Sequence, residues 1–254
     1  RFTQFNFRKL IIIDKDENQL TELNRELLLL FSKKKINKLF FIFSDINFLD
    51  LQKFIIKNKV THYLNFAAIK HVRSEEQLES IKYMFSTNSK NFLTNKKLSV
   101  KNNLKKVFSV SSDKSVSPQS LLGVSKKIME QRLSEFKKNN KNVFVSSVRF
   151  ANVSFSNGSI LKYIVDRINN KKIFGIPDKI YRYFITHTEA SSLCLKSLLK
   201  ENDNSILIPN NKVLKNLIAI KVLCTKILKY NGYNPMATVD FSRRGCIYCS
   251  EDIH

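Results

Sequence analysis

The stretch KVFSVSSDKSVSPQSLLGVSKKIMEQRLSEFKKNNKNVFVSSVR, residues 106–149, decides the fold of this chain. It begins and ends with apolar runs, Lys106–Ser111 and Val143–Arg149, each as long as a buried strand. Between them, Leu121–Phe136 carries apolar residues at helical spacing. Two strands joined by a helix in this way are typical of a βαβ unit, in which the strands lie parallel in one sheet.

The same alternation extends toward the N-terminus. Further strands are predicted at Lys9–Asp14, Leu39–Phe43 and His62–Phe66, and further helices at Glu17–Phe31, Phe48–Ile56 and Glu75–Phe92. The fold class is therefore α/β, a Rossmann-like doubly wound parallel sheet. From about residue 151 the alternation weakens, which is typical of a smaller substrate-binding part.

The composition is that of a globular protein, since 43% of the 254 residues are hydrophobic and 26% are charged. A chain of this length buries about 70–75% of its unfolded surface, which is enough for a sizeable core. Four cysteines are too few for a disulfide scaffold, and we find no uncharged stretch of about 18 residues that could form a transmembrane helix. We expect a cytoplasmic protein with no membrane segment in this chain.

Positive charge dominates, because 44 Lys and Arg residues stand against 21 Asp and Glu residues, a formal net charge of +23. Such a surplus is typical of nucleic-acid-binding proteins. Here the lysines are spread along the whole chain together with Asn, Ile and Phe, and they form no single stripe. We therefore expect solvated lysines and an anionic small-molecule ligand and no nucleic acid. Nucleic-acid binding remains an alternative that net charge alone supports.

Polar segments follow the predicted strands where each strand ends. These segments are Asp14–Lys15, Ser44–Asp45, Ala67–His71, Ser111–Lys114 and Arg149–Asn152. Because right-handed crossovers bring the carboxyl ends of parallel strands to one edge of the sheet, we expect these segments to form a ligand site there.

Asp14 closes the first predicted strand, where an acid commonly accepts hydrogen bonds from an adenosine ribose. The alternative is that Asp14 caps the helix that follows. The glycine fingerprint that precedes such an acid by about 20 residues is not found. We therefore expect this chain to begin after the first strand and its glycine-rich loop.

The segment Ser111–Lys114 follows a strand, and Lys126 lies in the next helix on the same face as Leu122 and Glu130. A strand-end hydroxyl that faces a helix lysine is the arrangement used by short-chain dehydrogenases. In such enzymes the lysine holds the nicotinamide ribose, and its charge lowers the pKa of a neighbouring acid. Taken alone, a helix lysine in so basic a chain is more often solvated.

Residues Val110–Lys127 resemble the S-T-D-K-A-x-x-P-x-x-x-M/Y-G-x-x-K segment of nucleotide-sugar 4,6-dehydratases of the capsular polysaccharide and flagellin-glycosylation type. These are extended short-chain dehydrogenases that act on UDP-N-acetylglucosamine. Three further blocks are similar to the family and follow in its order, namely Asn65–Val72, Val148–Ser159 and Tyr181–Thr186.

The resemblance implies a catalytic set of Ser112, Asp113, Lys114 and Lys126. Lys114 matches the base that removes the C5 proton, and Asp113 matches the acid that protonates the departing C6 hydroxyl. A buried lysine with a suitably lowered pKa can act as such a base. Ser112 matches the hydroxyl that polarises the C4 oxygen, and Lys126 matches the ribose-binding lysine.

The resemblance also implies the binding residues and the partners. NAD or NADP is expected to contact Asp14, Asp45, Ile46, Ala67, Ala68, Lys70 and Lys126, and a UDP-sugar is expected to contact Asn152 and Arg182. The implied parts are an NAD(P)-binding Rossmann-like domain at 1–150 without its first strand and glycine-rich loop, a substrate-binding part at 151–231 and a tail at 232–254. A homo-oligomer is expected.

Some positions depart from the family pattern. Leu122 replaces the catalytic Tyr, or the Met of one branch, so oxidation at C4 has to rely on Ser112, Asp113, Lys114 or water. A truncated, non-catalytic relative that keeps the fold therefore remains an alternative. The tail carries Cys246 and Cys249 in a C-x-x-C pattern, which is half of a zinc site or a redox pair. We expect no metal, because no second pair exists.

Overall fold

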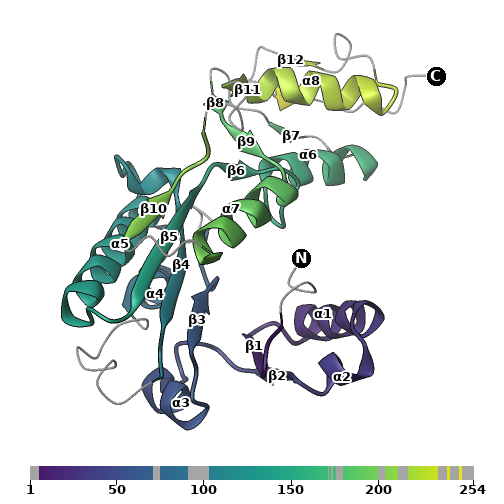
Figure 1. Ribbon diagram of the computed structural model, residues 1–254. Coiled ribbons are helices and arrows are strands. Elements are labelled where there is room, and N and C mark those ends of the chain that lie inside the picture. The colour runs from purple at the N-terminus through teal and green to yellow at the C-terminus, as the bar shows by residue number, and fades with distance from the viewer. Residues whose placement is uncertain are drawn as a thin grey trace. The chain divides into compact units, whose positions relative to one another are not determined.

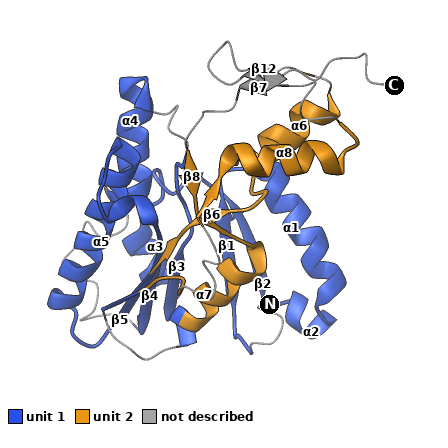
Figure 2. Cartoon of the chain, turned by 90° about the horizontal axis from the view of Figure 1, so that it is seen from above, with its two compact units in different colours: residues 1–147, 197–206 blue, residues 148–196, 207–254 orange. Residues whose placement is uncertain are grey.

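The computed structural model describes residues 6–70, 75–90, 103–170, 172, 174–175, 180–199, 204–210, 217–233, 239–240 and 246–247. The chain divides into two compact units, shown in Figure 2. Residues 1–147 and 197–206 form the first unit, and residues 148–196 and 207–254 form the second. The assignment of a cofactor role to one part and a substrate role to the other stays a prediction.

Six strands contribute to the first unit. They are β1 (Leu10–Asp14), β2 (Leu39–Phe43), β3 (His62–Asn65), β4 (Lys106–Ser112), β5 (Phe144–Phe150), whose last residues belong to the second unit, and β10 (Ser205–Leu207) at one edge, whose last residue does so too. The pairs β1–β2 and β3–β4 are both parallel, and the larger sheet has the order β10-β5-β4-β3. The α/β class is confirmed. Within the described residues the strands form two sheets, since no pairing joins β1–β2 to β3.

Helices connect these strands (Figure 1). They are α1 (Glu17–Leu30), α2 (Lys33–Ile36), α3 (Leu51–Lys57), α4 (Leu78–Phe85) with the π-helical η3 (Ser86–Lys90), the 3₁₀-helical η4 (Asp113–Ser115) and α5 (Leu121–Asn139). Helix α3 starts at Leu51 and not at the predicted Phe48, because the Asp50 carboxylate accepts a hydrogen bond from the Lys53 N–H at 3.1 Å and caps the helix. The short α2 was not predicted.

The core of the first unit lies between α5 and the larger sheet. Met129, Leu133 and Phe136 of α5 are buried in one cluster with Val107 of β4 and Val145 of β5. Burying each such side chain stabilises the fold by about 1.5–3 kcal/mol. This packing fixes α5 beside β4, so the start of the helix lies at the carboxyl end of that strand.

The second unit consists of short strands and three helices in its described residues. Its elements are β6 (Asn152–Val153), α6 (Ile160–Asn169), β7 (Phe174–Gly175), β8 (Tyr181–Arg182), β9 (Phe184–Ile185), α7 (His187–Leu199, whose last turn belongs to the first unit), β11 (Ile218–Ala219), α8 (Ile220–Tyr230), β12 (Val239–Asp240) and β13 (Cys246–Ile247). Its core joins α6 to α8 through Ile164, Ile168, Cys224 and Leu228. Among the described helices of the chain, none combines the length and the apolar character needed to cross a bilayer.

Candidate active site

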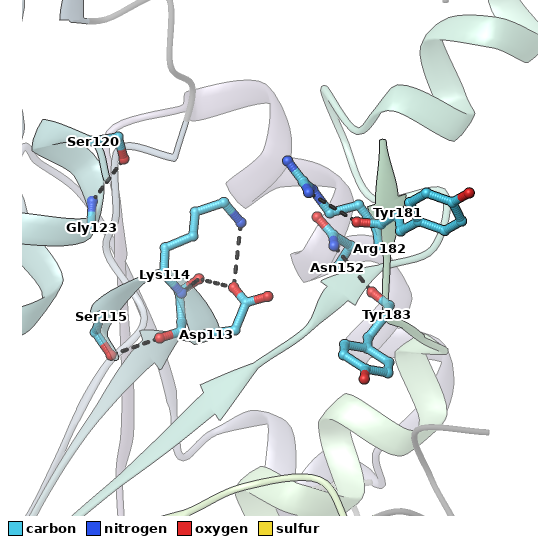
Figure 3. Close-up of polar contacts among 10 residues, drawn as sticks. Asp113, Lys114, Ser115, Ser120, Gly123, Asn152, Tyr181, Arg182 and Tyr183 are labelled. Carbon is cyan, nitrogen blue, oxygen red and sulfur yellow. Dashed lines mark hydrogen bonds and ion pairs between the residues drawn. The ribbon is translucent and has the colours of Figure 1, made fainter. Parts of the chain in front are cut away.

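The turn after β4 brings three predicted catalytic side chains together, of which Asp113 and Lys114 are labelled in Figure 3. Ser112 Oγ donates a hydrogen bond to Asp113 Oδ1 at 2.8 Å, and Lys114 Nζ lies 3.4 Å from the same oxygen. The side chains of Lys114 and Asp113 are 36% and 43% exposed, so Lys114 is not a buried lysine. The turn lies at the protein surface, where solvent screens this ion pair. It therefore presents an acid, a base and a hydroxyl that a substrate could reach.

A buried carboxylate holds this turn from behind. Glu130 of α5 is 8% exposed, and its Oε1 accepts a hydrogen bond from Ser111 Oγ at 2.6 Å. Ser115 Oγ lies 2.7 Å from the same oxygen and 2.7 Å from the Ser112 carbonyl oxygen, and its hydroxyl donates to one of them at a time. Hydrogen bonds to an ionised acceptor are about twice as strong as neutral ones. Glu130 thus ties both ends of the Ser112–Lys114 turn to α5.

Gly123 allows the start of α5 to touch the turn. A Cβ atom at this position would lie 2.6 Å from the Lys114 carbonyl oxygen and 3.1 Å from Cβ of Pro118. Ser120 caps the helix by accepting a hydrogen bond from the Gly123 N–H at 3.2 Å. Any larger residue at position 123 would displace the backbone that carries Lys114.

Lys126 is buried and not solvated, although composition favoured a solvated lysine. It is 5% exposed, and its Nζ donates a hydrogen bond to the Val110 carbonyl oxygen of β4 at 3.0 Å. Burial lowers the pKa of Lys126 to about 8, and the Glu130 carboxylate opposes that effect. A cation is therefore held behind the strand end, one helical turn from the Glu130 carboxylate.

Glu75 caps α5 from a distant part of the chain. Its two carboxylate oxygens accept hydrogen bonds from the Leu121 N–H at 3.2 Å and the Leu122 N–H at 3.0 Å. A negative charge at a helix N-terminus is stabilising. The Leu122 side chain is itself only 4% exposed and has no group that transfers a proton.

The buried Asn88 joins the loop after β3 to α5. Its Oδ1 accepts a hydrogen bond from the Ile69 N–H at 2.9 Å, and its Nδ2 donates to the Ile69 carbonyl at 2.9 Å and to Ser125 Oγ at 3.0 Å. The predicted cofactor residues Ala67, Ala68 and Lys70 lie in this loop: Ala67 is half-buried, whereas Ala68 and Lys70 are exposed. The loop is thereby fixed next to the helix that carries Lys126.

The ends of β1 and β2 bring two further predicted acids to one edge. Asp14 is exposed, and its Oδ1 accepts a hydrogen bond from the Asp16 N–H at 2.9 Å. The cap of α1 is Asp16 and not Asp14, since the Asp16 carboxylate accepts from the Gln19 N–H at 3.0 Å. The alternative in which Asp14 caps the helix is therefore wrong.

Asp45 follows β2 in a half-buried position beside Ile46, which is also half-buried. Burial alone would raise the pKa of Asp45, but hydrogen bonds from Tyr83 and Asn47 and the charge of Lys15 outweigh it and lower the pKa. The carboxylate is thus held in its ionised form.

The predicted sugar-binding residues lie in the second unit. The backbone N–H and the Nδ2 of Asn152 both donate to the Tyr183 carbonyl at 3.1 Å, and this contact joins β6 to the residue after β8. Arg182 is exposed, and its Nη1 donates to the Tyr181 carbonyl at 2.9 Å (Figure 3). Asn152 therefore contacts the residue that directly follows Arg182, and the exposed Arg182 guanidinium is available to an anion.

No group of His, Cys, Asp and Glu side chains in the described part of the chain could hold a metal ion. Cys246 begins β13, whereas Cys249 lies outside the described residues, so the C-x-x-C hypothesis stays a prediction.

The sequence pattern did not single out Tyr83, Asn88, Ser115 or Gly123 as site residues, and it placed Glu130 only on the Lys126 face. The i, i+4 spacing from Lys126 to Glu130 was the one local feature that could have indicated a buried pair. The other contacts join residues far apart in the sequence, or depend on how closely α5 approaches the turn.

The chain is similar to proteins of one family. Residues 1–246 match the family described as polysaccharide biosynthesis protein. The chain is 25% identical over 207 residues to the capsular polysaccharide biosynthesis protein CapD of Staphylococcus aureus. That alignment covers 77% of this chain but only 32% of CapD, so this chain spans less than half of its relative.

Two solved structures share the fold. UDP-glucuronic acid 4-epimerase from Bacillus cereus, in complex with UDP-glucuronic acid and NAD, superimposes with a TM-score of 0.72 at 17% identity, over 89% of this chain and 76% of the epimerase. A double mutant of DesIV, a dTDP-glucose 4,6-dehydratase from Streptomyces venezuelae with NAD bound, gives 0.71 at 14% identity, over 91% and 74%. At such identities the similarity shows the fold alone. Because the family match covers nearly the whole sequence, this chain belongs to the polysaccharide biosynthesis protein family.

Proposed function

We propose that this chain is an NAD(P)-dependent dehydratase that converts a UDP-N-acetylhexosamine to its 4-keto-6-deoxy form for surface polysaccharide or glycan biosynthesis. The observation that carries the proposal is the grouping of Ser112, Asp113 and Lys114 at the end of β4, with the Lys126 ammonium buried behind them. The family membership and the NAD-binding enzymes that share the fold support it.

The donors and acceptors at the strand ends fit a dinucleotide. The exposed Asp14 carboxylate suits ribose hydroxyls, and the Asp45 carboxylate suits the amine of adenine, next to Ile46. Lys126 has three N–H donors and gives one to Val110, so others can reach the hydroxyls of the second ribose. The small Ala67 and Ala68 leave room along the loop after β3.

The side chains of the turn supply the proton transfers. When bound, the cofactor would accept a hydride from C4 of the sugar and return it to C6, so no net redox change results. Ser112 polarises the C4 oxygen and passes the proton of the C4 hydroxyl to the Asp113 carboxylate, to which its own hydroxyl donates a hydrogen bond. The proton on C5 then becomes acidic, because C4 is a ketone. Lys114 takes the C5 proton in its neutral form, and the protonated Asp113 gives its proton to the C6 hydroxyl, which leaves as water. Lys114 finally returns its proton to C5.

Asn152 and Arg182 would hold the nucleotide-sugar, with the guanidinium on the diphosphate. A homo-oligomer stays a prediction.

The alternative function, a non-catalytic relative that keeps the fold and binds a UDP-sugar, is favoured by one observation. Leu122 stands where the family pattern has the proton-transferring Tyr, or the Met of one branch, and its side chain is buried.

Incubation of the chain with UDP-N-acetylglucosamine and either NAD or NADP tests the proposal. Mass spectrometry is expected to show a product that has lost one water, and Lys114→Ala is expected to abolish it. The fold of that variant should be intact, because a half-exposed ion pair contributes little. Lys53→Ala, whose side chain is 87% exposed, is the matched control. Undiminished product with Lys114→Ala would eliminate this base, and UDP binding without turnover or dinucleotide binding would favour the alternative.

A further inference from the structure

Tyr83 of α4 links the ends of the first two strands. Its hydroxyl donates a short hydrogen bond to Asp45 Oδ2 and accepts one from Lys15 Nζ at 3.2 Å. Lys15 Nζ also lies 4.8 Å from the centroid of the Tyr83 ring, which is within the range of a cation–π contact. Lys15 is thus held by both the ring and the hydroxyl of one side chain.

The position of this contact matters because Lys15 directly follows Asp14. Lys15 and Tyr83 both line an open hollow of about 1030 Å³, together with Ile69 and Ser86. The Lys15 charge also helps to lower the pKa of Asp45, after the hydrogen bonds from Tyr83 and Asn47.

Asp14 is left with an uncompensated charge. Its Oδ1 accepts from the Asp16 N–H, and within the described residues no Lys or Arg forms an ion pair with it. A carboxylate of this kind accepts hydrogen bonds from ribose hydroxyls and repels a phosphate on the same ribose. If Lys15 were free to approach Asp14, its positive charge would attract that phosphate and offset the repulsion.

We propose that Tyr83 is a specificity-determining residue of the cofactor site, which holds Lys15 through its ring and hydroxyl while it also hydrogen-bonds Asp45, and thereby makes the chain select NAD over NADP. The inference rests on the proposed function, because it requires a dinucleotide at the ends of β1 and β2. The acid at the end of β1, Asp14, does not by itself indicate a contribution from α4, and Tyr83 adds one.

Binding of NAD and NADP, measured by isothermal titration calorimetry without sugar substrate, tests the inference. The wild-type chain is expected to bind NAD more tightly. Tyr83→Phe keeps the ring but removes the hydroxyl and so frees Lys15. The ratio of the Kd for NADP to the Kd for NAD is then expected to fall about fivefold, which is the effect of one exposed charge contact. Adding Lys15→Ala to that variant should restore the preference, and Lys15→Ala alone should change it little.

Tyr163→Phe in α6 is the matched control and should leave both affinities unchanged. Equal affinities in the wild-type chain would overturn the inference, and so would a Tyr83→Phe variant that binds with an unaltered preference. If Tyr83→Phe does not fold, a large effect of Lys15→Ala alone would overturn it instead. A chain that binds neither dinucleotide overturns both proposals, whereas NAD selection without sugar turnover overturns only the dehydratase.

Discussion

Replacing Lys126 by Met tests whether burial of the Lys126 ammonium lowers the free energy of unfolding. The pKa of Lys126 falls from its ordinary value of 10.5 to about 8 on folding, because burial disfavours the charged form. Each unit of such a difference corresponds to about 1.36 kcal/mol, so holding the charged group costs about 3 kcal/mol at pH 7. Met fills a similar volume without the charge.

The sign follows from proton binding. Between pH 8 and 10.5 the folded chain has released the Lys126 proton, whereas the unfolded chain still binds it. Stability therefore rises with pH across this window, and the penalty is complete below it. Relative to Lys126→Met, the wild-type chain should gain about 3 kcal/mol in free energy of unfolding between pH 7 and 10.5.

Urea unfolding of both proteins at a series of pH values, without cofactor, measures this difference. The comparison cancels other groups that titrate over the same range. Lys53→Met, at a position whose side chain is 87% exposed, should differ from wild type by an amount that is constant with pH. A constant difference for Lys126→Met as well, or one that falls as pH rises, would refute the buried position of this ammonium.

Two further changes test how α5 supports the catalytic turn. Glu130→Ala removes the acceptor of Ser111 and Ser115 and should lower the free energy of unfolding by about 3–5 kcal/mol, whereas Glu130→Gln, which keeps the shape and one acceptor, should cost about 1–2 kcal/mol. Equal losses in urea unfolding would contradict the role of the carboxylate. Gly123→Ala should destabilise the chain by about 1–3 kcal/mol and reduce turnover, because its Cβ meets the Lys114 carbonyl at 2.6 Å. A gain of about 1 kcal/mol, the ordinary effect of this change in a helix, would show that α5 does not touch the turn.

The sequence predicted the strands and helices of the first unit closely, because short apolar runs alternate with helical spacing there. The strand predicted at Lys106–Ser111 corresponds to β4, which extends one residue further, to Ser112. The helix predicted from Leu121 starts at that residue. Local capping moved one boundary, since Asp50 sets the start of α3. Such boundaries depend on a single hydrogen bond and are the least predictable part of an element.

The environment of the candidate site was harder to predict because it depends on contacts between distant residues. Glu75 caps a helix whose first residue lies 46 positions further along the chain. Lys126 is buried although composition favoured a solvated lysine, whereas Lys114 is partly exposed, and residue type alone cannot tell which lysine a helix covers. The packing of α5 against β4 determines both the burial of Lys126 and the exposure of Lys114.

Helix α5 sets the positions of both lysines of the candidate site. Its first turn contacts the Lys114 carbonyl through Gly123, its second carries Lys126, and its third holds the turn through Glu130. A shift of α5 along its axis would therefore move the proposed base and the proposed ribose-binding cation together. The edge with Asp14 is held separately, by β1–β2 pairing and the Tyr83 contacts of α4. Substitutions that disturb α5 should thus reduce turnover of the sugar without changing the preference for NAD over NADP. Substitutions at Tyr83 should change that preference without reducing turnover.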